Sequence, residues 1–122
     1  NLVNGSGETY IAYLFATVAG VSKVGSYTGD GTTGRVIDCG FTSGAKFVVI
    51  KPTSQTGSWI VYDTARGIIA GNDPFLQLNN TPGQVTDADD IDPDNSGFIV
   101  NQATGNYLNQ SSVDYIFYAI AT

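Results

Sequence analysis

The stretch Val113-Asp-Tyr-Ile-Phe-Tyr-Ala-Ile-Ala121, near the end of this 122-residue chain, decides the fold class. It contains one charged residue and neither Gly nor Pro, and its aromatic and β-branched residues favour strands over helices. A continuous apolar run of this kind predicts a central strand that is buried on both faces. We therefore expect the rest of the chain to be arranged as strands around it.

The same pattern occurs a second time near the start of the chain. At an offset of 105 residues, seven of the first sixteen positions are identical, namely Asn1, Asn4, Ser6, Tyr10, Ile11, Tyr13 and Ala16. In both copies a polar, turn-like segment leads into an apolar strand, which predicts a tandem module. We interpret 1–17 as the closing strand of a preceding repeat or a strand donated to a neighbour. Residues 18–122 then form one β-sandwich repeat module.

The duplicated strand leads to a hypothesis about assembly. One module needs a single copy of this strand, so the first copy is free to add to a neighbouring module. The apolar side chains of this assembly strand are Tyr10, Ile11, Tyr13 and Phe15. The expected partners are further copies of the chain, which predicts a homo-oligomer.

The remaining segments also read as strands, and none shows a helical apolar period over three turns. Strands are expected roughly every 8 to 15 residues, with turns rich in Gly, Asn or Asp between them. The clearest hairpin pairs Ala45–Lys51 with Ser58–Thr64, whereas Thr81–Asn95 reads as a long acidic loop. We predict an all-β fold, an antiparallel two-sheet β-sandwich of jelly-roll-like form.

Composition excludes several classes of function. Eleven Asp and Glu against five Lys and Arg give a net charge of -6, so nucleic-acid binding has no electrostatic support. No apolar run approaches the roughly 20 residues of a membrane-spanning helix. The sequence has no His and a single Cys39, so it offers neither a Ser-His-Asp triad nor a zinc site. We expect no enzymatic activity and a small buried hydrophobe at Cys39.

The acidic loop is the one candidate for a metal site. Asp90, Asp92 and Asp94 place carboxylates at alternate positions, and calcium prefers such oxygen ligands. The spacing fails the EF-hand pattern, because Asn95 stands where that loop needs Gly. We therefore expect no cofactor, with Ca²⁺ bound by these three residues as the alternative.

Two further motifs have a structural and a functional interpretation. Trp59 and Tyr62 are candidates for stacking on a glycan, although they fall on opposite faces of a predicted strand. Asp63 and Arg66 are expected to form an ion pair around a bend. The glycines of Gly29-Asp-Gly-Thr-Thr-Gly34 match a dinucleotide-binding pattern, but a strand follows instead of a helix, so we predict a turn.

Several phrases of the sequence resemble the repeat module of phage virion structural proteins, which occurs in tail-fibre-like proteins of marine and cyanobacterial phages. The phrases include Gly25-Ser-Tyr-Thr-Gly-Asp-Gly31, Ile37-Asp-Cys-Gly-Phe41, Trp59-Ile-Val-Tyr-Asp-Thr-Ala-Arg-Gly67, Asn72-Asp-Pro-Phe-Leu-Gln-Leu78 and Tyr115-Ile-Phe-Tyr-Ala-Ile-Ala121. The resemblance implies a location in a virion or at a cell surface. It brings no catalytic residues with it.

From the residues and the resemblance together we expect a structural or adhesive module of a virion fibre or a similar appendage. Its partners would be copies of itself, other virion proteins and host-surface glycans. The alternative is a self-assembling filament or capsid-decoration subunit, which is joined by strand addition and has no receptor role.

Overall fold

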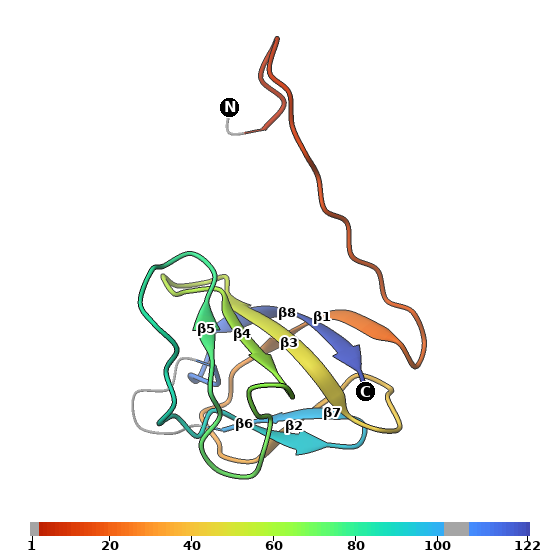
Figure 1. Ribbon diagram of the computed structural model, residues 1–122, viewed down its shortest axis with the longest axis vertical. Coiled ribbons are helices and arrows are strands. Elements are labelled where there is room, and N and C mark those ends of the chain that lie inside the picture. Colours follow the sequence, from red (N-terminus) through yellow and green to blue (C-terminus); the bar gives the residue numbers. More distant parts are fainter. Residues whose placement is uncertain (1–2, 102–107) are drawn as a thin grey trace.

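The chain forms two antiparallel β-sheets in a computed structural model that describes residues 3–101 and 108–122 (Figure 1). The five-stranded sheet has the order β1-β8-β3-β4-β5, and the three-stranded sheet has the order β2-β7-β6. The strands are β1 (Ser22–Thr28), β2 (Arg35–Asp38), β3 (Ala45–Pro52), β4 (Ile60–Asp63), β5 (Leu76–Gln77), β6 (Ile91–Asp94), β7 (Gly97–Val100) and β8 (Asp114–Ala121). This architecture confirms the predicted all-β sandwich. Asn1 and Asn106, the first identical pair of the repeat, lie outside the described residues.

Strand β8 lies between β1 and β3, so the stretch that decides the fold class is an interior strand of the larger sheet. Tyr115 and Ala119 are fully buried, and Phe117 is nearly so. Ile116, which faces the other way, is 40% exposed. The prediction of burial on both faces is therefore wrong, because the three-stranded sheet covers only one face of β8.

The core lies between the two sheets. Phe98 of β7 meets Phe117 of β8 edge to face, with ring centroids 5.4 Å apart. Tyr27 of β1 stacks on Tyr115 at 4.9 Å. Cys39 is buried in the same core, as predicted. Aromatic contacts of this geometry add to the free energy gained from the buried area alone.

The predicted hairpin is confirmed, because β3 and β4 pair antiparallel with Val49 opposite Val61. The ion pair between Asp63 and Arg66 at the end of β4 is also confirmed. The predicted acidic loop, in contrast, contains β6. Pro93 is tolerated in β6 because this strand lies at the sheet edge, where one side needs no ladder hydrogen bonds.

In residues 3–101 and 108–122 no helix is long and apolar enough to cross a membrane. Residues 3–17 belong to neither sheet. They leave the sandwich and run far from it, as the red and orange trace of Figure 1 shows.

Candidate assembly site

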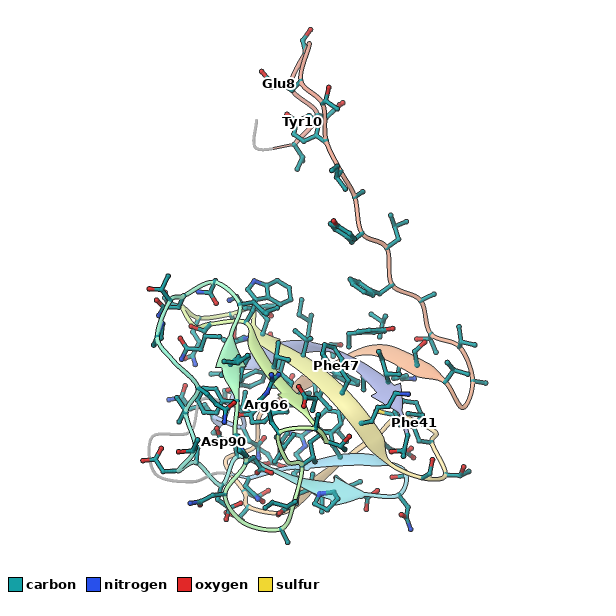
Figure 2. The ribbon with its side chains drawn as sticks, viewed as in Figure 1. Glu8, Tyr10, Phe41, Phe47, Arg66 and Asp90 are labelled. Carbon is teal, nitrogen blue, oxygen red and sulfur yellow. The ribbon has the colours of Figure 1, made fainter. Side chains whose placement is uncertain are left out.

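Residues 3–17, here called the arm, expose most of their apolar side chains. The exposed fractions are 82% for Ile11 and Tyr13, 62% for Phe15 and 47% for Tyr10. Leu14 reaches 88%, the largest value among the exposed apolar residues of the described chain. In Figure 2 the labelled Tyr10 lies on a segment that extends away from the body of the protein. All four residues of the predicted assembly strand thus lie on one exposed segment, but they form no strand in this chain.

Short-range hydrogen bonds fix the root of the arm to strand β1. The backbone of Val18 makes two hydrogen bonds with Ser22, and the Ser22 hydroxyl donates to the Ala16 carbonyl at 2.8 Å. The Val24 N–H donates to Oγ1 of Thr17, and this hydroxyl donates back to the Val24 carbonyl. The two backbone groups of Val24 would otherwise pair with the next residue of a hairpin. The hydroxyl of Thr17 therefore ends the pairing, and the arm leaves the sheet edge.

The arm touches the body again at Phe15. Its ring lies 4.6 Å from the ring of Tyr118, which is on the outer face of β8. Tyr13 and Phe15 together line one side of an apolar groove of about 560 Å³ across the outer face of the five-stranded sheet. We call this the sheet-face groove.

The floor and far wall of the sheet-face groove come from residues distant in the sequence. The floor is formed by outward side chains of β1, β3 and β8, namely Val24, Phe47, Val49, Ile116 and Tyr118. Trp59, just before β4, and Leu78, just after β5, close the side opposite the arm. Leu78 is 64% exposed, and no charged residue lines the groove. The surface is suited to an uncharged, apolar partner.

The two candidate glycan residues differ in accessibility. The Trp59 side chain is on the surface, since the residue is 40% exposed. The Trp59 backbone N–H donates a hydrogen bond to Oδ1 of Asn79 at 2.8 Å. Tyr62 is fully buried, and its hydroxyl donates to Asp90. Burial raises the pKa of Tyr62 well above its usual value. Only Trp59 of this pair can reach a ligand on the surface.

A model for DUF7483, a domain of unknown function, matches residues 1–122. The chain belongs to this family. The match includes the arm as well as the sandwich. No curated protein and no solved structure matches this DUF7483 domain. These comparisons give no link to virion proteins, so that resemblance stays a prediction.

The three candidate calcium ligands of the DUF7483 domain do not converge. Asp90 accepts the Tyr62 hydroxyl, whereas Asp94 accepts the N–H and hydroxyl of Ser96. Asp92 accepts from Asn101 at 2.8 Å and from the backbone of a nearby glycine. Among the described residues, no group of three or more His, Cys, Asp or Glu side chains is placed to hold a metal ion. These carboxylates fix loops instead.

Two of the acidic side chains are buried. Asp73 accepts the Ile69 N–H on one oxygen at 3.0 Å and the Ile91 N–H on the other at 3.1 Å. Desolvation raises its pKa to about 6, although both hydrogen bonds oppose this shift. The pKa of Asp90 is also raised, mainly by burial. Asp73 carries no signal of this role in the sequence, because a single Asp before Pro74 is typical of a turn.

The Gly29–Gly34 segment is a bent loop that connects β1 to β2 in the other sheet, and a strand follows it, as predicted. A buried asparagine holds this loop. The Asn109 side-chain amide donates to Oδ1 of Asp30 at 2.8 Å and to the Thr32 carbonyl at 2.7 Å. Asn109 is fully buried. Its counterpart in the repeat, Asn4, has a positive φ of 62° and is exposed. The repeat itself was the signal for a structural Asn at this position.

Proposed function

We propose that this chain is a non-enzymatic structural module that joins a neighbouring copy of itself through its arm. The observation that carries the proposal is the exposure of Ile11 and Leu14, at 82% and 88%, on a segment whose hydrogen bonds to the described part of the body lie at its root. Burying such side chains is favourable by roughly 25 cal/mol per Å² of apolar surface. Association that covers the arm would supply this free energy.

The setting proposed for this assembly is a virion fibre or a similar surface appendage, where modules act as rigid spacers or subunits of a filament. The resemblance to virion modules and the duplicated strand support this setting. Strand addition is the proposed mode, because the arm repeats the pattern of a strand that is already paired on both sides in the body.

A second candidate function is adhesion to a host-surface glycan at Trp59. This indole is exposed, and polar side chains adjoin it on one side: Ser58 bonds Gln77 at 3.2 Å, and Asn79 accepts the Trp59 backbone N–H. An exposed aromatic ring beside such groups is suited to stacking on a sugar.

The assembly proposal is tested by measuring the molar mass of the full chain over a range of concentrations by sedimentation equilibrium. We expect association that the double variant Ile11→Ser with Leu14→Ser abolishes. The matched control is Val36→Ser on β2, which removes an exposed apolar side chain outside the arm. A full chain that stays monomeric, or a double variant that associates as strongly, would refute the proposal.

The adhesion candidate is tested separately with a glycan panel. We expect saturable binding by the full chain, lost in Trp59→Ala and kept in Leu78→Ala. Equal binding by the Trp59→Ala variant would rule this site out.

A further inference from the structure

We propose that the sheet-face groove of one copy receives the arm of a second copy of this chain. The inference rests on the proposed function, in which the arm joins two copies. It places the contact on the face of the five-stranded sheet, where side chains pack, in place of strand addition at a sheet edge. The side chains that enter the groove are Ile11 and Leu14, which are 82% and 88% exposed and do not line the groove of their own chain.

The arm and the groove hold most of the exposed apolar surface. Of the fourteen large apolar side chains exposed in the described residues, six lie on the arm, four line the groove outside the arm, and four lie elsewhere. Residues 10–16 are apolar at every position, so both sides of an extended segment need cover. Within one chain Tyr13 and Phe15 touch the groove, and this contact leaves Ile11 and Leu14 exposed. A second copy can supply the missing cover.

The arm is a poor replacement for β8, so it would add to a copy and not exchange with its strand. In the repeat Leu14 corresponds to Ala119, which is fully buried, and Ala12 corresponds to Phe117. Exchange would force four heavy atoms into the place of a methyl group and leave a cavity where Phe117 meets Phe98. Overpacking and cavities are both destabilising. The outer face, where the groove lies, imposes no such constraint.

A contact between the arm and the groove of two copies places no charged side chain in the interface. The chain carries a net charge of -6, so two copies repel one another over most of their surface. Residues 9–22 contain no charged side chain, and neither does the lining of the groove. Contact between these two uncharged surfaces therefore brings two copies together with little burial of charge. The nearly complete absence of polar groups from the groove also favours an apolar peptide over a sugar.

The test uses two full-length variants with complementary defects. The arm variant carries Ile11→Ser and Leu14→Ser, and the groove variant carries Leu78→Ser and Ile116→Thr. All four side chains are at least 40% exposed, so both variants should fold, which circular dichroism checks. Each variant alone should associate at least tenfold more weakly than the full chain. An equimolar mixture should form a heterodimer, because it contains one intact arm and one intact groove.

Three outcomes distinguish this inference from the function on which it rests. A groove variant that associates as strongly as the full chain overturns the groove but leaves arm-mediated assembly standing. A mixture without heterodimers also overturns the groove. A full chain that is monomeric at every concentration overturns both.

A crosslinking experiment removes the dependence on the groove variant. A chain with Ile11→Cys is mixed with a chain with Leu78→Cys, and a short bismaleimide is added. Cys39 is buried, and its raised pKa, about 11, keeps its thiol unreactive. We expect a crosslinked heterodimer, and no more than background when Val36→Cys replaces Leu78→Cys. Equal crosslinking to both positions would contradict the inference.

Discussion

Strand β8 and the arm share a sequence pattern but differ in their surroundings. Tyr115 and Tyr10 occupy the same position of the repeat, yet Tyr115 is fully buried and Tyr10 is 47% exposed. β8 has β1 and β3 as hydrogen-bonded neighbours and the smaller sheet beneath it. Among the described residues, the arm hydrogen-bonds to the rest of the chain only at its root. An apolar β pattern thus indicates that a segment is stable only when other strands cover it. Whether such strands are available depends on the rest of the chain.

The largest expected effect comes from truncating the tyrosine in each copy. Tyr115→Ala removes a ring stacked on Tyr27 and opens a cavity in the core, which should lower the free energy of unfolding by about 3–5 kcal/mol. The matched variant Tyr10→Ala should change it by less than about 0.5 kcal/mol. Urea unfolding followed by circular dichroism measures both. Similar losses in the two variants would show that the arm is part of the folded core.

A second comparison uses the asparagines that precede the two strands. Asn109→Ala removes three hydrogen bonds that a fully buried side-chain amide makes with Asp30 and Thr32. We expect a loss of about 2–4 kcal/mol in the free energy of unfolding. Asn4→Gly, at an exposed position with positive φ, should cost less than about 0.5 kcal/mol. A small change in the free energy of unfolding in Asn109→Ala would mean that the loop at Asp30 is stable without these hydrogen bonds.

A third prediction concerns pH and the buried Asp73. Burial raises its pKa in the folded state to about 6, well above the usual value of an Asp, so the folded state binds the proton more tightly. The stabilisation is fully present below the unfolded pKa and is lost as the pH rises through about 6. Urea unfolding at pH 4 and pH 7 should therefore show a stability loss that Asp73→Asn reduces. Asn accepts only one of the two N–H groups, so this variant should also lose about 1–2 kcal/mol at pH 4. A slope unchanged by Asp73→Asn would assign the pH dependence to another group, such as Asp90.

Much of the sandwich could be predicted because its strands carry local signals. The runs around Val48, Ile60 and Tyr115 are apolar or alternate between apolar and polar residues, a pattern that predicts strands. Turns with Gly or Asp separate these runs. Strand β6 was missed because Asp92 and Pro93 are typical of loops. It exists through its pairing with β7, which no local pattern reveals.

The candidate sites were less predictable for the same reason. The exposure of the arm follows from its lack of a partner within the chain, which the duplication indicated. The sheet-face groove combines Val24, Trp59, Leu78 and Tyr118, which only the sheet order brings together. The acidic run predicted carboxylates that converge on one metal ion. In the structure each carboxylate accepts hydrogen bonds from a different donor.

The smallest expected effect on stability is the removal of the arm by chymotrypsin, which cleaves after Tyr, Phe and Leu. Proteolysis needs an extended, accessible segment, so sites between Tyr10 and Phe15 should be cut long before those in β8. The cleaved body keeps Thr17 and its bonds to Val24, so its free energy of unfolding should stay within about 0.5 kcal/mol of the intact chain. Mass spectrometry identifies the cut sites, and urea unfolding gives the stability. If a second copy covers the arm, the first-order rate constant of cleavage should fall as protein concentration rises at a fixed, low concentration of protease. A rate independent of concentration would indicate that the arm is as exposed in solution as it is in the single chain.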